Sequence, residues 1–373
     1  MLIALFFVLC MAYYLRFMLL SAMAFSRKTC LATKNRLPSV SVVIPARNEA
    51  ATLEECLTSV LKQTYAGEWE VILVDDHSVD ETASIAETLA SSYPQLRVCR
   101  MELQGETFAY KKAAITAGIG LAKGEIIVQT DADCMVNPGW LHQMATAFEE
   151  KTAFISGPIQ LTHGKTLLEK IQSLESMGLV TLGAGSLLRG FPNMCNGANM
   201  AYRKSVFEEV EGFKGVDHVA SGDDELLLQK IHALGKYNLD FMACREAIVK
   251  TPALDNWPDL KAQRLRWVSK IRAYYSKRVN YIQSVAYLAF LGIPILGLGA
   301  IWFPFLVWWM LGLIVAKVGG DIFVLSRAAN FFQKKDLLRY ILPMQPLYLA
   351  YVLWIGIAGS LVQAYPWKGR TVK

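Results

Sequence analysis

Three apolar blocks stand out along the chain, at residues 1–24, 281–325 and 341–364. An α-helix rises about 1.5 Å per residue, so about 20 apolar residues cross the hydrocarbon core of a bilayer. Residues 1–24, in which Arg16 is the one charge, are therefore predicted to form a transmembrane anchor. A signal peptide or a core helix is the alternative, but the run is long and its flanking charges follow it.

The two C-terminal blocks predict further membrane helices. Residues 281–325 are too long for one span, so we expect a hairpin of two helices that turns near Pro304. Residues 341–364 fit either one span or a re-entrant segment. Several tryptophans near the block ends are typical of the aromatic belts at membrane interfaces.

Between the first two blocks, residues 38–260 show short buried strands that alternate with helices. Strands are predicted at 40–44, 69–74, 97–101 and 126–130, and helices at 53–61, 82–89 and 111–122. Such a βαβ series is typical of an α/β fold with a mostly parallel, doubly wound, Rossmann-like sheet. The fold class is therefore an α/β domain with transmembrane helices at both ends.

Polar residues follow three of the predicted strands, at 45–49, 75–78 and 131–133. In parallel sheets, ligands bind in the crevice outside the carboxyl ends of the strands. We therefore expect these clusters to converge on one site. No Gly-x-Gly-x-x-Gly follows the first strand, which counts against a dinucleotide oxidoreductase.

Charge and composition agree with a membrane protein. The hydrophobic fraction is 53% and the net charge is +6, and the mean hydropathy is +0.29. Basic residues flank the apolar blocks, which by the positive-inside rule predicts a multi-pass protein of the cell (inner) membrane whose catalytic domain is cytoplasmic. They are Arg27, Lys28, Lys34, Arg36, Lys261, Arg264, Arg266, Lys270, Arg272, Lys277, Arg278, Arg327, Lys334, Lys335 and Arg339.

Two further features bear on location and partners. With four spans the basic tail at 367–370 falls on the wrong side, so its topology stays open. No separate basic patch exists, which excludes a nucleic-acid partner. The seven cysteines include no Cys-x-x-Cys pair, so we expect neither a zinc site nor a disulfide framework, as suits a reducing cytoplasm.

Asp131 and Asp133 carry the first candidate chemistry. They follow a predicted strand, and alternation along an extended segment would point both carboxylates to one side. Such a pair suits Mg²⁺ or Mn²⁺, which would keep coordination sites for phosphate oxygens and act as a Lewis acid. A solvated loop is the alternative for the motif alone. Its position at a strand end favours the metal site.

Asp75 and Asp76 follow the second strand. They are candidates for hydrogen bonds to a base or ribose, or for capping of the next helix. Lys111 and Lys112 offer positive charge to a phosphate, or else lie at a solvated helix start. Both alternatives remain open at this point.

Three acids precede an apolar helix at 223–225. One acid at a helix N-terminus is explained by capping, but three exceed that need. We therefore predict a general base here and choose Asp224, with Asp223 as the alternative. Asn196 begins an Asn-Gly-Ala-Asn segment that suits either a turn or close approach by a sugar.

Residues 261–280 form a basic amphipathic stretch ahead of the second apolar block. It is predicted to be an interfacial helix with snorkelling cations. Gln263, Arg266 and Trp267 are also candidates for contacts with a diphosphate and an acceptor.

With these motifs assembled, the chain resembles the membrane-bound family 2 glycosyltransferases, which have a GT-A fold. The resemblance covers about residues 40–270 and rests on five ordered motifs. They are Val-Val-Ile-Pro-Ala-Arg-Asn-Glu49, Val74-Asp-Asp-His-Ser78, Thr130-Asp-Ala-Asp133, Gly222-Asp-Asp224 and Gln263-Arg-Leu-Arg-Trp267.

The resemblance implies roles for these residues. The site would bind a nucleotide-sugar through Pro45, Arg47, Glu49, Asp75, Asp76, Lys111, Asp131, Asn196, Gln263, Arg266 and Trp267, and a metal through Asp131 and Asp133. The third acidic motif usually reads Glu-Asp, whereas here it is Asp-Asp, which leaves the choice of base between 223 and 224 less secure. The reaction implied is a single displacement with inversion, from an α-linked UDP-sugar to a β-glycoside.

Three functions follow as hypotheses. The first is transfer of one sugar to a lipid acceptor, as in the similar bacterial carotenoid and ceramide glycosyltransferases, and the second is processive polysaccharide synthesis on a glycan acceptor. A silent scaffold or transporter accessory is the third, weakly supported by Lys317 and Asp321 near one end of a span. The sequence names neither the sugar, the acceptor nor the oligomeric state.

Overall fold

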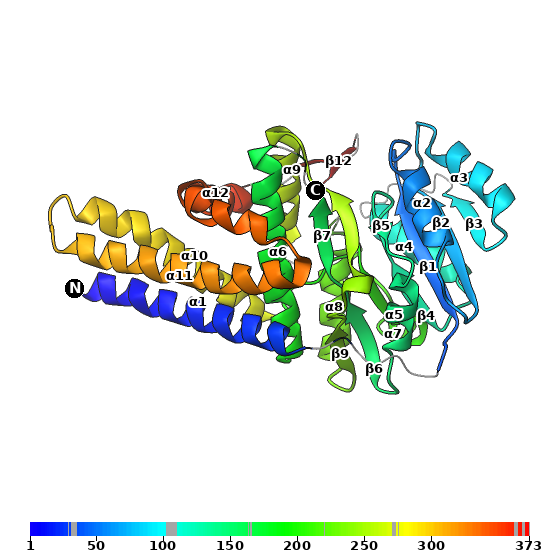
Figure 1. Ribbon diagram of the computed structural model, residues 1–373, viewed down its shortest axis with the longest axis horizontal. Helices are drawn as coiled ribbons and strands as arrows, with labels where there is room; N and C mark the ends of the chain where they lie inside the picture. The colour runs from blue at the N-terminus through cyan, green and yellow to red at the C-terminus, as the bar shows by residue number, and fades with distance from the viewer. Residues whose placement is uncertain are drawn as a thin grey trace.

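The computed structural model describes residues 1–28, 30, 36–101, 110–162, 164, 166–219, 221–270, 274, 276–361, 365–367 and 370–372. An α/β body lies at one end of the molecule and a group of long helices at the other (Figure 1). Of the basic residues that flank the apolar blocks, Lys34 and Arg272 lie outside the described residues, as do residues 368 and 369 of the tail.

The body is built on a seven-stranded sheet with the order β3-β2-β1-β4-β8-β6-β9. β1 pairs in parallel with β2 and β4, whereas β8 runs antiparallel to β4 and β6. The mostly parallel α/β sheet predicted from the sequence is confirmed. Its strands are β1 (Val40–Ala46), β2 (Trp69–Asp75), β3 (Leu96–Arg100), β4 (Ile126–Gln129), β6 (Thr152–Ser156), β8 (Met200–Arg203) and β9 (Asn238–Phe241).

Alternate side chains of the central strand β1 enter two different hydrophobic cores. Val42 and Ile44 pack with α2 (Leu53–Leu61) on one face, and Val43 packs with α4 (Tyr110–Leu121) on the other. The period of two in a strand produces this division. The remaining helices of the body are α3 (Thr82–Ser92), α5 (Trp140–Thr146), α7 (Lys204–Glu209) and α8 (Asp223–Ala233).

A small second sheet lies next to the acidic motif. It has the order β5-β10-β7, with β5 (Met135–Val136), β10 (Val249–Pro252) and β7 (Ile159–Thr162). β5 begins two residues after Asp133 and pairs antiparallel with β10. The exit from the acidic motif is therefore held by backbone hydrogen bonds.

One long helix, α6 (Leu167–Leu188), joins the body to the membrane-type helices. It packs against α1 (Leu2–Arg27) and α11 (Leu306–Phe332). At Gly185 a Cβ atom would lie 1.9 Å from the Ser21 carbonyl oxygen, so only glycine allows this approach of α1. The sequence analysis did not predict α6. It begins with a capping box between Thr166 and Glu169.

Among the described residues, four segments are long and apolar enough to cross a membrane by length and composition: Leu2–Arg27, Lys277–Gly299, Leu306–Phe332 and Lys335–Gly359. α10 (Lys277–Gly299) and α11 form a hairpin joined by residues 300–305, which include Pro304. The N-terminus and this connection lie at the end of the molecule farthest from the main sheet (Figure 1).

α12 (Ile341–Leu361) contacts the body near both of its ends. Its first turns pack on Leu174 and Met177 of α6. Near its last turn, a Cβ at Gly359 would lie 2.1 Å from Val268 of α9 (Trp257–Ser269). The short hairpin β11 (Tyr365–Trp367) and β12 (Arg370–Val372) follows, and β11 also contacts α9. Residues 362–364 of the predicted segment lie outside the described residues.

The stretch 261–280 is not the single interfacial helix that we predicted. α9 begins earlier, at Trp257, where Asn256 caps its N-terminus, and it ends at Ser269. α10 starts separately at Lys277, capped by Ser276. Two N-caps, Asn256 and Ser276, thus begin two separate helices, and residues 271–273 and 275 between them lie outside the described residues.

Lys317 and Asp321 of α11 form an ion pair of 2.6 Å. Gln345 of α12 completes the group, since its amide donates to Asp321 at 2.9 Å. These charges are therefore satisfied between two helices, which explains their burial without a transport function.

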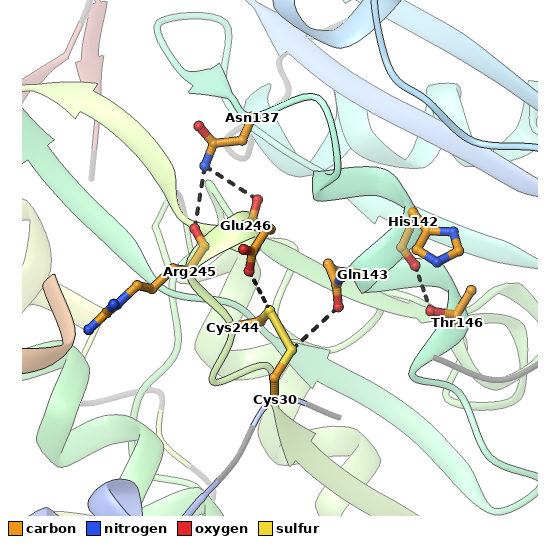
Figure 2. The surroundings of a disulfide bond; sticks show 8 residues. All are labelled: Cys30, Asn137, His142, Gln143, Thr146, Cys244, Arg245 and Glu246. Atoms are coloured by element: carbon orange, nitrogen blue, oxygen red, sulfur yellow. Dashed lines mark hydrogen bonds between the residues drawn. A yellow bond between two sulfur atoms is a disulfide. The ribbon is translucent and has the colours of Figure 1, made fainter. Parts of the chain in front are cut away.

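The prediction that the cysteines form no disulfide is wrong. Cys30 and Cys244, which are 214 residues apart in sequence, are bonded (Figure 2). Gln143 and Glu246 lie against the two sulfur atoms. Pairing over such a separation is decided by the fold and leaves no local spacing signal. A disulfide is also typical of oxidising compartments, which is contrary to our expectation for this domain.

Candidate active site

Two adjoining cavities lie at the carboxyl edge of the main sheet. The larger has a volume of about 520 Å³ and the smaller about 130 Å³. They share four charged residues: Lys111, Asp131, Asp133 and Arg266. The polar clusters predicted at the strand ends therefore meet in one place.

The acidic motif itself lies in a turn, and not in the extended segment that we predicted. β4 ends at Gln129, and the Cys134 amide donates to the Asp131 carbonyl oxygen at 3.2 Å, which closes the turn. Ala132 is buried between the two acids. Both carboxylates nevertheless line both cavities, because the turn brings them to the same side.

The loop after β1 forms one wall of the smaller cavity. Its lining includes Pro45, Arg47 and Glu49. The Arg47 guanidinium donates to the carbonyl oxygens of Asp76 and His77 at 2.6 and 2.9 Å. Two loops that are distant in sequence are thereby fixed to each other.

The two acids that follow β2 separate into different roles. Asp76 lines the smaller cavity. Asp75 lines neither cavity, and its Oδ1 accepts a hydrogen bond from the Ser78 amide at 3.3 Å. At the start of the next helix it is Asp80, one residue before the N-cap Glu81, whose Oδ1 accepts from the Thr82 amide at 3.1 Å. Asp76 is therefore the candidate for contact with a nucleotide.

Lys111 joins the first acidic motif to the third. Its Nζ lies 2.7 Å from Asp131 Oδ1 and 3.4 Å from Asp223 Oδ2. Burial alone would lower the pKa of Lys111, but the two carboxylates outweigh this and raise it. Lys111 is therefore a partly buried cation paired within the site, which disagrees with the alternative of a solvated helix start.

Asp223 and Asp224 open helix α8 and line the larger cavity. Asp223 accepts a hydrogen bond from Gln129 at 3.1 Å, and its side chain is 8% exposed. Burial disfavours its charged form, yet Lys111 and the neighbouring lysines outweigh burial and lower the pKa of Asp223. Asp224 is the more accessible of the two, with 15% of its side chain exposed.

Asn196 forms the turn that was one alternative for it and also lines the larger cavity, whereas its contact with a sugar stays a prediction. Its Oδ1 accepts from the Ala198 amide at 2.9 Å. The Gly197 amide donates to Asp224 Oδ2 at 3.1 Å. A Cβ at Gly197 would lie 3.1 Å from Asp223, so glycine lets the turn approach both acids closely.

Helix α9 brings the Gln-x-x-Arg-Trp motif over the site. Gln263, Arg266 and Trp267 all line the larger cavity. Arg266 also lines the smaller one, where Asp76 and Glu49 lie. A guanidinium at this junction suits a diphosphate that spans both cavities.

A second group of charged residues, next to Asp224, was not predicted from the sequence. Lys270 lies 3.1 Å from Glu225 and 3.7 Å from Asp224, and the Tyr274 hydroxyl donates to Glu225. Burial raises the pKa of Glu225. Spacing could have found Lys270, because a position four residues after Arg266 lies on the same helix face.

The carboxylates at 131 and 133 fit a hard divalent cation. Mg²⁺ and Mn²⁺ need only one or two protein carboxylates when phosphate oxygens and water complete the shell. Within the described parts of the chain, no group of three or more His, Cys, Asp or Glu residues could hold a metal alone. The set therefore suits a metal that arrives with a phosphorylated ligand.

The lining of the larger cavity combines the acids at 131, 133, 223 and 224 with residues of two long helices, α6 and α12. These helices supply polar groups, such as Gln172 and Glu175, and also a set of mostly apolar side chains. They include Leu179, Val180 and Gly183 from α6, and Tyr348, Val352 and Ile355 from α12. The same cavity thus offers polar groups to a sugar and apolar groups to a hydrocarbon.

Comparison with known proteins agrees with this geometry. Residues 41–211 match the family model described as glycosyl transferase family 2. The match covers somewhat less than half of the chain, so it places residues 41–211 in this family. The resemblance to family 2 glycosyltransferases predicted from the sequence is confirmed for this region.

Curated relatives in this family match only part of their length. The chain is 31% identical over 192 residues to glycosyltransferase AglE of Haloferax volcanii, covering 50% of this chain and 59% of that protein. It is 33% identical over 116 residues to a beta-monoglucosyldiacylglycerol synthase of Nostoc sp., covering 31% and 24%. The match thus spans less than two thirds of the length of either relative.

A solved structure covers nearly the whole fold. The mannosyltransferase PcManGT from Pyrobaculum calidifontis, in complex with GDP-Man and Mn²⁺, matches with a TM-score of 0.55 and 20% identity. The match covers 97% of this chain and 93% of that protein. The predicted GT-A fold with membrane-type helices is therefore confirmed.

Proposed function

We propose that this enzyme transfers one sugar from a nucleotide-sugar to a lipid acceptor at the cytoplasmic face of the membrane, with inversion. The observation that carries the proposal is the lining of the larger cavity. This lining joins Asp131, Asp133, Asp223 and Asp224 to residues of α12 such as Val352 and Ile355. A donor and an apolar acceptor would meet at the acids.

The nucleotide would occupy the smaller cavity, with Asp76 and Glu49 near its base or ribose. The diphosphate would lie between Lys111 and Arg266, which line both cavities. A UDP-sugar was our expectation from the sequence. The GDP-Man bound to PcManGT makes a guanine donor the second one to test.

Asp131 and Asp133 would hold Mg²⁺ or Mn²⁺ together with the diphosphate. When bound there, the metal would neutralise the charge that develops on the leaving group. Lys111 and Arg266 add two more positive charges at the same place. A structural relative solved with Mn²⁺ is consistent with this assignment.

Asp224 would act as the general base. It would take the proton from the acceptor hydroxyl, while the acceptor oxygen forms a bond to C1 of the sugar. The C1–oxygen bond to the diphosphate breaks, and the leaving group keeps the electron pair. Both acids line the larger cavity, and the greater exposure of Asp224 favours it over Asp223.

A lipid acceptor is supported by the apolar part of the cavity lining and by one relative's name. α12 exposes Leu342, Leu347, Trp354 and Ile357 on its outer side, as a helix in contact with lipid would. The Nostoc relative is a glucosyldiacylglycerol synthase. A lipid could therefore pass from the bilayer along α12 to the acids.

The location is proposed from the basic residues. Arg27 and Lys28 lie where α1 meets the body, and Arg327 lies near the same end of α11. By the positive-inside rule this end is cytoplasmic. The disulfide argues the other way, so the side of the membrane needs a direct measurement.

The test is incubation of the purified protein with radiolabelled UDP- and GDP-sugars, total membrane lipid and Mg²⁺ or Mn²⁺. We expect label in one chloroform-soluble product, and none after chelation of the metal. Label in high polymer would favour a processive synthase instead, and turnover without metal would overturn the mechanism.

A further inference from the structure

Lys112 is a buried lysine that has no place in the reaction described above. It follows Lys111 in α4, but its side chain does not line either cavity. Its ammonium donates three hydrogen bonds to the carbonyl oxygens of Val216, Val219 and Ser221, at 2.8, 2.6 and 3.0 Å. The residue is 2% exposed.

An ammonium has three N–H donors, and these three bonds use all of them. The acceptors lie along one loop between α7 and α8, whose described residues, 210–219 and 221–222, include a series of turns. Its last residue, Gly222, has a φ of 79° and caps α8. Asp223 and Asp224 follow at once, so the loop decides where both acids stand.

The three carbonyl groups do not depend on Lys112 equally. The Val216 carbonyl also accepts from the Val219 amide at 3.2 Å. Ser221 is buried, and its carbonyl accepts from Lys112. Loss of the ammonium would therefore remove a donor above all from the carbonyls of Val219 and Ser221, the two acceptors nearest to the acids.

We propose that Lys112 is a positioning residue, which fixes the loop that sets Asp223 and Asp224 against the donor. Lys111 contacts Asp223 directly, whereas Lys112 bonds to the loop that precedes both acids. This inference rests on the proposed function, since it assigns the two acids to catalysis. A displacement of about 1 Å in such a group lowers the rate by about 100-fold.

A merely structural lysine is available as a matched control. Lys230 of α8 donates to the carbonyl oxygens of Gly212 and Lys214, at 2.6 and 2.9 Å. These acceptors lie at the far start of the same loop. Lys230→Met therefore removes the same kind of bond from the same loop, but away from the acids.

The experiment compares Lys112→Met, Lys112→Arg and Lys230→Met in the full-length protein in detergent. Donor affinity, kcat with the lipid acceptor and Tm are measured for each. We expect Lys112→Met to lower kcat about 100-fold with donor affinity within threefold, and Lys112→Arg to recover part of the rate. Lys230→Met should lower Tm but leave kcat within threefold. Equal losses of kcat in Lys112→Met and Lys230→Met would overturn the proposal.

Hydrogen exchange separates this inference from the proposed function. Lys112→Met should speed amide exchange at residues 221–226, whereas Lys230→Met should speed it only at 211–216. If Lys112→Met does not fold, Lys112→Gln, which keeps two N–H donors, takes its place. Should the wild type transfer no sugar, the proposed function fails, and unchanged exchange at 221–226 would still overturn the role of Lys112.

Discussion

Lys111 lies 2.7 Å from Asp131, so a cation of the protein itself already contacts the proposed metal motif. The same ammonium lies 3.4 Å from Asp223. It therefore links Asp131, which is proposed to bind the metal, with Asp223, the neighbour of the proposed base Asp224. With a diphosphate present, Lys111 has anionic partners on both sides.

Replacement of Lys111 by Met should weaken donor binding by about 10–100-fold. A hydrogen bond to a charged group contributes about 1.5–3 kcal/mol, and the variant also leaves Asp223 with one cation fewer. Titration of the donor by calorimetry, with metal present, measures this. Lys204→Met, which removes a lysine bonded to the Ala122 carbonyl far from the site, should bind the donor normally. Unchanged affinity in Lys111→Met would contradict the assignment.

Asp133→Asn should abolish metal-dependent turnover, with a fall of about 10³-fold or more, because loss of electrostatic stabilisation at a leaving group has effects of this size. The amide keeps the shape of the side chain and removes its charge. Turnover at increasing Mn²⁺ concentration is the measurement, with the exposed Asp255→Asn as control. Full activity of Asp133→Asn at ordinary Mn²⁺ concentrations would remove it from the metal site.

The strand-end acids could be predicted from the sequence because parallel strands present their carboxyl ends at one edge. Asp76 and Asp131 meet at the cavities for this reason, whereas Asp224 reaches them from the N-terminus of helix α8. The turn at Asp131 could not be predicted, since the strand pattern gives no sign that β4 ends at Gln129. The hydrogen bonds of the Lys112 side chain could not be predicted either, because its three acceptors are backbone atoms more than 100 residues away in sequence.

Helix α6 was missed for a different reason. Its buried positions include Gln172, Ser173, Thr181 and Ser186 as well as leucines. A helix that packs on several sides has no single apolar stripe, so periodicity does not reveal it. The lining of the larger cavity comes partly from α6, and the acceptor side of the site was therefore less predictable than the donor side.

Glu175 of α6 and Arg264 of α9 form a buried ion pair of 2.5 Å in the wall of the larger cavity. Glu175→Gln alone should destabilise the protein by about 3–5 kcal/mol, because it leaves a buried guanidinium without its counter-ion. The double variant Glu175→Leu/Arg264→Met should recover most of this. Thermal unfolding in detergent measures both, and a double variant no better than the single one would contradict this account.

The charge of Lys112 predicts opposite effects of pH on stability and on activity. Burial lowers its pKa from 10.5 to about 8, although Asp223, Asp224 and Asp217 oppose this and Lys270 adds to it. Between these values the unfolded chain binds a proton that the folded protein does not. The free energy of unfolding should therefore rise with pH across this window, by about 3 kcal/mol at the limit.

Activity should fall over the same range, because a neutral amine keeps only two of the three N–H donors. The measurement is kcat and denaturant unfolding from pH 7 to 10, in the wild type and in Lys112→Met. The difference between the two proteins isolates Lys112 from other titrating groups. If the difference between wild type and Lys112→Met shows that stability falls together with activity above pH 8, the assignment is contradicted.

The Cys30–Cys244 pair provides the measurement that decides the side of the membrane. Cys30 follows α1 and Cys244 lies between β9 and β10, so the bond ties the anchor to the catalytic body. The ion pair between Lys28 and Asp240, at 2.8 Å, holds the same contact without it.

If the body is cytoplasmic, we expect both cysteines to be trapped as thiols by rapid alkylation of intact cells, and to form the disulfide on oxidation of the purified protein. The Cys244→Ser variant should keep its activity, because Lys28 and the packing of α1 on α6 remain. A disulfide already present in freshly trapped cells would place the body in an oxidising compartment and contradict the cytoplasmic assignment, whatever the distribution of basic residues.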